Sequence, residues 1–130
     1  MSSTVELTKE NFDQLVDQNE FVLIDFWAEW CPPCRQFAPV YEKAAADNPD
    51  LVFGKVDTEA QPELAAAFAI QSIPTLMIIR DKVAVFAQPG ALPAQVFADL
   101  IDQARNLDMD EVRKNIATQE QGQQQGQEQQ

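Results

Sequence analysis

The sequence predicts an α/β fold in which helices cover both faces of a mixed β-sheet. Three observations support this. First, apolar, strand-like runs alternate with amphipathic, helix-like segments. Second, the segments in the first half of the chain follow the order of a right-handed βαβ unit. Third, two later apolar runs are spaced for an antiparallel hairpin. The chain of 130 residues is long enough for one domain with a hydrophobic core and too short for two ordinary domains.

The first half of the chain holds the predicted βαβ unit. An apolar run interrupted only by Asp25 is typical of a central strand that is covered on both faces. Apolar residues at three-to-four spacing predict the helices around it, and a proline near the start of the last one suits a helix N-terminus. In chain order, we expect a helix over 9–18, a strand over 21–27, a helix over 34–47, a strand over 51–57 and a helix over 62–68.

The second half predicts a hairpin, a helix and a tail. The hairpin has no glycine in its turn, and the last thirteen residues are mostly glutamine, which cannot bury enough apolar surface to offset the entropy of ordering. We expect strands over 75–79 and 83–86, a helix over 92–106, a domain over 1–107, a further short helix over 108–117 and a flexible tail over 118–130.

Charge and composition limit the classes of partner and chemistry. The formal net charge of −12 makes nucleic acids and anionic lipid surfaces poor partners, and no apolar run approaches the roughly 20 residues that span a bilayer. The N-terminus lacks a basic stretch followed by an apolar one, so we expect no secretory signal and a cytoplasmic location. We also expect a monomer. Histidine is absent, which removes catalytic schemes built on a histidine base and the commonest neutral metal ligand.

Cys31 and Cys34, the two cysteines of the chain, form a Cys-x-x-Cys motif that has three explanations. A structural zinc site needs four ligands, and the chain has no further cysteine and no histidine, so no metal is expected. A structural disulfide would close a very small loop, where the entropic stabilisation is least, in a compartment that keeps thiols reduced. The third explanation is a redox-active pair.

The position of the motif favours redox chemistry. The two cysteines lie between a buried strand and an amphipathic helix, where unpaired N–H groups and the helix dipole favour a thiolate on the first cysteine. Cys31 is therefore the candidate nucleophile. Cys34, three residues later on the same helical face, can attack a mixed disulfide formed by Cys31. The expected redox group is the Cys31–Cys34 disulfide itself, without a further cofactor.

A wider set of residues resembles the thioredoxin family in order and spacing over about residues 4–106. The set is Asp25-Phe26-Trp27-Ala28-Glu29-Trp30-Cys31, Pro33-Cys34, Lys55, Ile73-Pro74-Thr75 and Gly90-Ala91. The resemblance implies a thioredoxin fold with about five strands, about four flanking helices and a cis-proline loop. It also implies reduction of disulfide-containing protein substrates, with electrons from an NADPH-dependent flavoprotein, thioredoxin reductase.

Asp25 and Lys55 are the other two candidate catalytic residues. A carboxyl buried without a full partner has a raised pKa and can exchange protons near neutral pH. The resemblance implies that Asp25 accepts and donates the proton of Cys34, often through water, and that Lys55 is its electrostatic partner. The alternatives are a carboxylate satisfied by backbone donors at a strand end and a solvated lysine.

The resemblance also implies a flat surface that binds substrate proteins. In the family the bond before the proline equivalent to Pro74 is cis and faces the cysteines, and the preceding residue pairs with an extended substrate strand. Trp27 is expected in the core, whereas Trp30 is expected in an exposed apolar patch. The predicted substrate contacts are Trp30, Pro33, Ile73, Pro74, Thr75, Gly90 and Ala91.

One departure from the family lies between the cysteines, where Pro32 replaces the usual glycine. Proline removes a backbone N–H near the Cys31 sulfur and restricts φ, so thiolate stability and loop relaxation are expected to differ. Two other functions stay open from the sequence. The chain could be a thioredoxin-like oxidant or isomerase, or a binding module that uses the fold without redox chemistry.

Overall fold

The computed structural model describes residues 3–128, with side chains described through residue 118. A five-stranded sheet has the order β1-β3-β2-β4-β5. β1, β3 and β2 are parallel, whereas β4 and β5 run antiparallel to their neighbours, so the sheet is mixed as predicted. The strands are β1 (Val5–Glu6), β2 (Phe21–Trp27), β3 (Val52–Asp57), β4 (Thr75–Arg80) and β5 (Val83–Pro89).

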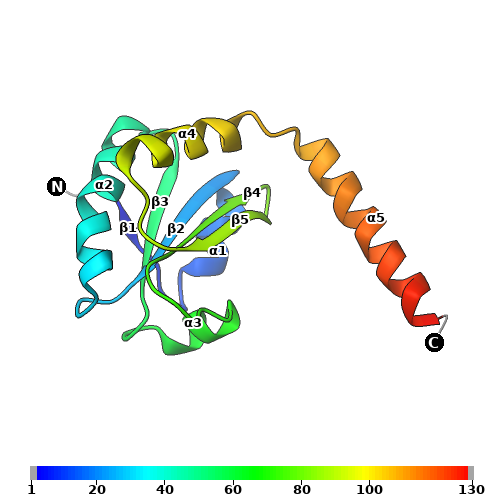
Figure 1. The fold of residues 1–130 in the computed structure, drawn as a ribbon, viewed down its shortest axis with the longest axis horizontal. Coiled ribbons are helices and arrows are strands. Elements are labelled where there is room, and N and C mark those ends of the chain that lie inside the picture. The colour runs from blue at the N-terminus through cyan, green and yellow to red at the C-terminus, as the bar shows by residue number, and fades with distance from the viewer. Residues whose placement is uncertain (1–2, 129–130) are drawn as a thin grey trace.

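Four helices cover the sheet and a fifth extends away from it (Figure 1). The covering helices pack in two pairs, α2 with α4 on one face and α1 with α3 on the other. Within residues 3–128, no helix is both long enough and apolar enough to cross a membrane. The helices are α1 (Phe12–Gln18), α2 (Pro32–Asp47), α3 (Pro62–Ala67), α4 (Ala94–Arg105) and α5 (Met109–Glu128).

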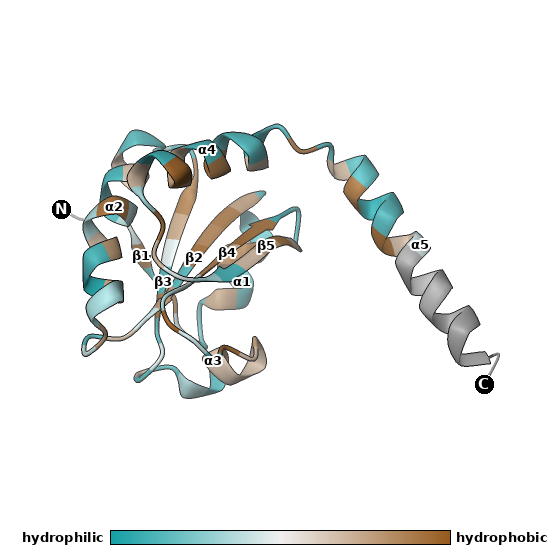
Figure 2. Ribbon diagram, viewed as in Figure 1, coloured by the Kyte–Doolittle hydropathy of each residue, from teal (hydrophilic) through white to brown (hydrophobic). Residues whose placement is uncertain are grey.

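The core has two layers because successive residues of β2 point to opposite faces of the sheet. Phe21 and Leu23 pack against α2 and α4, and Val22, Ile24 and Phe26 pack against the opposite layer. Figure 2 shows that the central strands are mostly brown, hence apolar, whereas α2 and α4 carry both teal and brown residues. Asp25 follows this alternation and therefore belongs to the face covered by α2, the helix that begins at the cysteines.

The sheet contains one strand that the sequence did not predict, and it contains the predicted hairpin without a glycine in its turn. β1 is a strand of two residues that pairs with β3, and such a short segment has no periodic pattern by which the sequence could identify it. The hairpin between β4 and β5 forms without glycine, because Asp81 and Lys82 themselves adopt positive φ values of 51° and 69°. Asp81 N donates a hydrogen bond to Glu20 O at 2.9 Å, which helps to hold this turn.

α5 is longer than the helix expected over 108–117. It continues to Glu128, through much of the glutamine-rich segment, and glutamine has a good intrinsic helix propensity. Met109 is buried, and Arg113 forms an ion pair of 3.4 Å with Asp81 in the β4–β5 turn, so the start of the helix contacts the domain. The flexibility of 118–130 stays a prediction, and its last two residues, 129–130, lie outside the described residues.

Candidate active site

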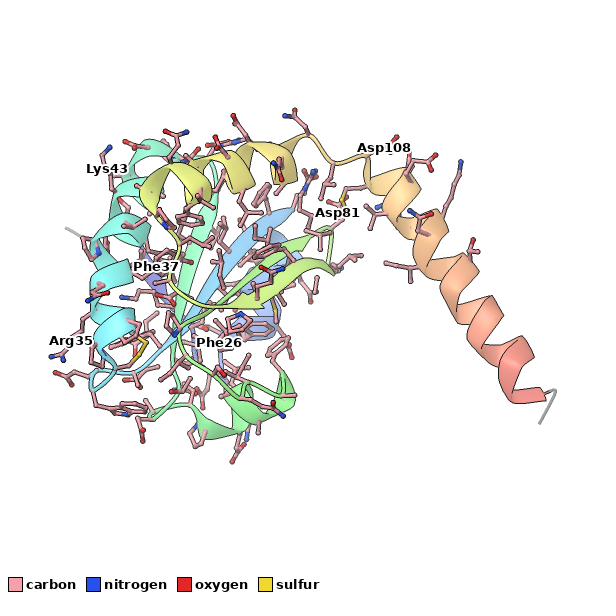
Figure 3. All side chains as sticks on the ribbon, viewed as in Figure 1. Phe26, Arg35, Phe37, Lys43, Asp81 and Asp108 are labelled. Atoms are coloured by element: carbon pink, nitrogen blue, oxygen red, sulfur yellow. A yellow bond between two sulfur atoms is a disulfide. The ribbon has the colours of Figure 1, made fainter. Side chains whose placement is uncertain are left out.

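The two cysteines are joined by a disulfide at the first turn of α2. Their Cα atoms are 5.2 Å apart, and both side chains are buried. Cys31 is the N-cap residue of the helix, and its Sγ accepts a hydrogen bond from Cys34 N at 3.3 Å. Pro32 and Pro33 between them are exposed. Figure 3 shows the yellow sulfur–sulfur bond near the end of α2 that carries Arg35.

A loop with a cis peptide bond between Ile73 and Pro74 lies beside the disulfide. Cys31 Sγ is 3.7 Å from Ile73 O, a contact rather than a hydrogen bond because a disulfide sulfur has no hydrogen to donate. Gly90 N donates to Pro74 O at 2.7 Å, which joins this loop to the segment after β5. Gly90 has φ +111°, a conformation that favours glycine. The predicted cis-proline loop is therefore present and next to the first cysteine.

Asp25 is a buried carboxyl near the C-terminal end of β2, the central strand of the sheet. Its neighbours in register are Lys55 on β3 and Leu76 on β4, and its side chain is 1% exposed. Neither carboxyl oxygen has a hydrogen-bond partner within the described part of the chain. Burial raises the pKa of Asp25 to about 7, and the positive charge of Lys55 opposes part of that rise. The carboxyl can therefore gain or lose a proton near neutral pH.

Lys55 lies near Asp25 without forming an ion pair with it. Its Nζ is 4.7 Å from the centre of the Trp27 ring, a cation–π contact, and no carboxylate of the described side chains lies within ion-pair distance. Lys55 thus acts on the carboxyl through space, as a partly exposed charge.

Tyr41 is a second ionisable group near Asp25. Burial and the nearby charge of Asp25 both raise the pKa of Tyr41, whose hydroxyl donates to Gly54 O at 2.6 Å.

The predicted substrate contacts differ in exposure. Trp30 is 63% exposed, Ile73 is half-buried, and Pro33, Gly90 and Ala91 are exposed. Pro74 and Thr75 are buried, and the Thr75 hydroxyl donates to Ser72 O at 2.5 Å within its own loop. The side chains of Pro74 and Thr75 are thus less available than those of the other predicted contacts.

One polar neighbour of the site is missing from the sequence-based predictions. Glu59, in the loop after β3, accepts a hydrogen bond from the Trp30 indole, with 2.7 Å between Nε1 and Oε1. The available signal was topological: β2 and β3 are parallel, so their carboxyl ends, and the loops that follow them, meet at the same edge of the sheet. The loop after β3 begins with Thr58 and Glu59, so this topology places an acidic side chain there.

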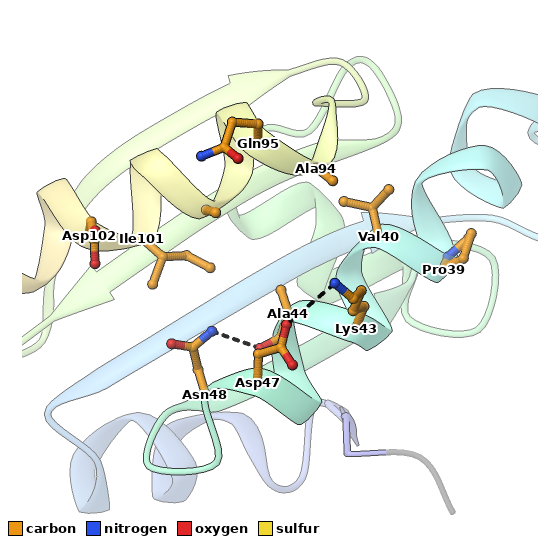
Figure 4. Close-up of a pocket in the computed structure, with 11 residues that line it drawn as sticks. Pro39, Val40, Lys43, Ala44, Asp47, Asn48, Ala94, Gln95, Ile101 and Asp102 are labelled. Atoms are coloured by element: carbon orange, nitrogen blue, oxygen red, sulfur yellow. Dashed lines mark hydrogen bonds and ion pairs between the residues drawn. The ribbon is translucent and has the colours of Figure 1, made fainter.

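A groove of about 490 Å³ lies elsewhere, between α2 and α4 (Figure 4). Lys43 and Asp47 form an ion pair of 3.9 Å on one wall, and Asn48 Nδ2 donates to Ala44 O at 2.9 Å. None of the eleven residues drawn around this groove is a cysteine or another predicted site residue. The candidate active site is therefore an open surface around the disulfide and not this groove.

Comparisons with known proteins agree on one family. The family model described as Thioredoxin matches residues 3–103. A Streptomyces coelicolor protein named "Putative thioredoxin 2" is 78% identical over 120 residues, which cover 92% of this chain and 90% of that protein. The solved Plasmodium falciparum thioredoxin is similar with a TM-score of 0.70 and 34% identity, over 75% of this chain and 96% of that one. A mutant thioredoxin from Halobacterium salinarum has a TM-score of 0.74 and 28% identity, over 82% and 96%.

Proposed function

This chain belongs to the thioredoxin family, and on that premise we propose that its two cysteines act in a fixed order. The chain is a thiol-disulfide oxidoreductase that reduces protein disulfides with its Cys-x-x-Cys redox pair. In the proposed order, Cys31 attacks the substrate disulfide and Cys34 resolves the mixed disulfide. The observation that carries the proposal is the position of the Cys31 sulfur at the N-cap of α2.

The proposed reaction moves two electrons from one pair of sulfurs to another. The Cys31 thiolate attacks one sulfur of the substrate disulfide, and the other substrate sulfur leaves as a thiolate. The Cys34 thiol then loses its proton and attacks Cys31 Sγ, which releases the second substrate sulfur and forms the intramolecular disulfide. The substrate is reduced, and the cysteine pair reaches the oxidised state described above.

Two features favour a thiolate on Cys31, and a third places its sulfur beside the predicted substrate loop. The backbone N–H of Cys34 points to the sulfur, and the N-terminus of a sixteen-residue helix favours negative charge there. The sulfur also contacts the backbone of Ile73. The same loop would receive an extended segment of the substrate through backbone pairing before Pro74. An incoming disulfide held in that way would lie next to Cys31.

We propose that Asp25 manages the proton of Cys34. A general base works best when its pKa lies near the working pH, and burial raises the pKa of Asp25 to about 7. The carboxyl shares its sheet face with α2, which carries Cys34. Lys55, its register neighbour, would set the balance between the two protonation states through its charge.

We propose that a flat, apolar surface around the disulfide binds substrate proteins. Several of its members are exposed, and Ile73 contacts the Cys31 sulfur, which suits recognition of many protein surfaces rather than of one small molecule. The buried members shape the loop that pairs with the substrate backbone. The proposed contacts are Trp30, Pro33, Ile73, Pro74, Thr75, Gly90 and Ala91.

The Cys-Pro-Pro-Cys form of the motif gives this active site a proposed property of its own. Pro32 and Pro33 have no backbone N–H, so the Cys34 N–H is the first amide of α2 that can donate to the Cys31 sulfur. We propose a weaker thiolate and a more rigid loop than a Cys-Gly-Pro-Cys motif would give.

The partners follow from the family at two levels. A thioredoxin works with a reductase that restores its dithiol and with substrate proteins that carry disulfides. More specifically, we propose an NADPH-dependent flavoprotein reductase, a cytoplasmic setting and a monomer that does not bind nucleic acid or membranes, in keeping with the net charge of −12. We also propose residues 1–107 as the catalytic domain, to which α5 is an addition.

Trapping with Cys34→Ser tests the proposed order. Without the resolving thiol, the mixed disulfide on Cys31 should persist and identify the substrates by mass spectrometry after purification under non-reducing conditions. The matched control is Cys31→Ser, which should trap no partner and should lose disulfide reduction. Trapping through Cys34 in the control, or none through Cys31, would contradict the proposed order.

A further inference from the structure

Trp30 is exposed to solvent and yet held in one orientation. Its side chain is 63% exposed, so packing alone does not fix the ring. The single polar atom of the indole, Nε1, donates to Glu59 Oε1 at 2.7 Å. This distance is typical of a hydrogen bond to a charged acceptor, the stronger kind of hydrogen bond. The bond therefore ties an exposed aromatic ring beside Cys31 to a carboxylate from a different loop.

The loop that carries Glu59 is itself fixed by hydrogen bonds. Thr58 donates twice to Trp27 O, from its backbone N at 2.9 Å and from Oγ1 at 3.0 Å. Asp57 Oδ1 accepts from Glu59 N at 3.0 Å and from Ala60 N at 3.3 Å. Trp27 is the last residue of β2, after which the chain turns toward Trp30 and Cys31. Both partners of the indole bond are thus anchored to the same strand end.

Two other carboxylates lie close to Trp30 without this bond. Glu29 and Asp57 line a hollow of about 350 Å³ together with Trp30 and Glu59. Among the described side chains, Glu59 is the acceptor that the indole N–H reaches. The chain therefore offers an internal comparison: Glu29 brings the same charge to the same hollow without the hydrogen bond.

We propose that Glu59 is a positioning residue that holds the Trp30 indole in the orientation in which it contacts substrate proteins. The inference rests on the proposed function, in which Trp30 belongs to the substrate-binding surface. A freely rotating aromatic ring loses conformational entropy when a partner binds, and this loss weakens binding. A ring that Glu59 already holds in place loses less entropy at that step. Glu59 thus favours formation of the complex with a protein substrate and leaves the sulfur chemistry to Cys31 and Cys34.

The experiment compares Glu59→Ala, Glu59→Gln and Glu29→Gln in the full chain. Glu59→Ala removes the acceptor, and it should raise KM for a protein disulfide about threefold to tenfold while kcat stays within about twofold. Its preference for the protein over a small aromatic disulfide should fall by the same factor. Glu59→Gln keeps an amide oxygen as acceptor and should restore most of the preference. Glu29→Gln removes a charge only and should resemble the native chain.

The indole N–H gives a direct reading of the bond. The chain has two tryptophans, so its ¹⁵N–¹H spectrum has two indole signals, and Trp30→Phe identifies one of them. Glu59→Ala should shift the Trp30 signal and speed its exchange with water, and Glu59→Gln and Glu29→Gln should change it little. Native values of KM and indole exchange in Glu59→Ala, or an equal rise of KM in Glu29→Gln, would overturn the proposal.

A trapping arm separates this inference from the proposed function. Cys34→Ser should trap partners whether or not Glu59→Ala is also present, at lower yield in the double variant. If Cys34→Ser alone traps nothing, the proposed order of the cysteines fails. If it traps partners equally well with and without Glu59→Ala, only the role of Glu59 fails.

Discussion

The two ends of the central strands β2 and β4 differ in their polar groups. The cysteines, Asp25 and the cis-proline loop lie toward one end, and Arg80 lies at the other. Arg80 Nη1 donates to three backbone carbonyls after and within the last turn of α4, and its guanidinium stacks 5.4 Å from the centre of the Phe21 ring. Arg105, nearby, donates to both carboxylate oxygens of Asp50 and to Asn48. At this end, most of the charged donor groups have partners.

The cysteine end leaves polar groups without such partners. Within the described chain, both oxygens of Asp25 and the Trp27 Nε1 are buried and have no hydrogen-bond partner, whereas at the Arg80 end this is true only of Arg80 Nε. A buried polar group without a partner costs stability and, if it is ionisable, has a shifted pKa. The two ends of the sheet thus differ. At the Arg80 end most charged groups are paired and stabilise the fold, whereas at the cysteine end a buried carboxyl has a pKa near 7 and is available for proton transfer.

The largest expected effect concerns Asp25 and the dependence of stability on pH. The folded-state pKa of about 7 exceeds the ordinary aspartate pKa of 3.8, so between these values the folded state holds a proton that the unfolded state releases. The contribution of Asp25 to the free energy of unfolding should therefore be highest below pH 3.8 and fall as the pH rises to 7, by about 4 kcal/mol for about three pKa units. Asp25→Asn should remove this fall, as measured by urea unfolding of the oxidised forms at pH 4, 6 and 8.

Asp50 and Glu63 have lowered carboxyl pKa values, so their ion pairs make the protein more stable as the pH rises. Both pairs are present in the native chain and in Asp25→Asn, so their effect cancels in the difference between the two. Parallel curves for the native chain and Asp25→Asn would show that Asp25 is not the buried acid. In kinetics, Asp25→Asn should slow disulfide reduction about 10- to 100-fold, at or below the lower end of general acid–base contributions, and should flatten the rise of the rate through pH 7. Unchanged rates between pH 6 and 9 would argue against the catalytic role.

Arg80→Met should have the next largest effect, at the opposite end of the sheet. It removes a charged donor from the C-terminus of α4 and should lower the free energy of unfolding by about 2–3 kcal/mol. Disulfide reduction at a temperature where the variant is folded should stay native, because Arg80 lies far along β4 from the cysteines. The control is Lys82→Met, which breaks an exposed ion pair with Asp17 and should cost about 0.5 kcal/mol or less. If Arg80→Met and Lys82→Met lowered the free energy of unfolding equally, Arg80 would contribute no more to stability than an exposed ion pair.

Pro32→Gly should have the smallest effect and sharpens the description of the reactive end. In a Cys34→Ser background, the thiolate fraction of Cys31 at pH 7 should rise about twofold to fivefold, because residue 32 regains a backbone N–H near the sulfur. Absorbance at 240 nm during a pH titration measures the thiolate. Pro32→Ala restores the N–H without the backbone flexibility of glycine. It therefore separates the effect of the regained N–H from the effect of a more flexible loop. An unchanged or lower thiolate fraction in both variants would contradict the proposal.

The sequence by itself determined the features that depend on neighbouring residues. The apolar run at 21–27, the helical periodicities and the spacing of Cys31 and Cys34 correctly predicted the α/β fold, the mixed sheet and the redox pair. Such features can be read locally, because side chains alternate along strands and repeat every three or four residues along helices. The lack of histidine and of further cysteines left thiols, carboxylates and lysines as the groups that can exchange protons near neutral pH.

Tertiary structure decided the features that depend on pairing between distant segments. The register of β2 with β3 puts Lys55 beside Asp25, and the parallel ends of those strands bring Glu59 to Trp30, 29 residues earlier in the chain. β1 is a strand only because β3 lies beside it. Burial set the pKa of Asp25, and burial is a property of the packed layers and not of the residue. Local patterns define which elements form, whereas contacts between elements define which side chains meet.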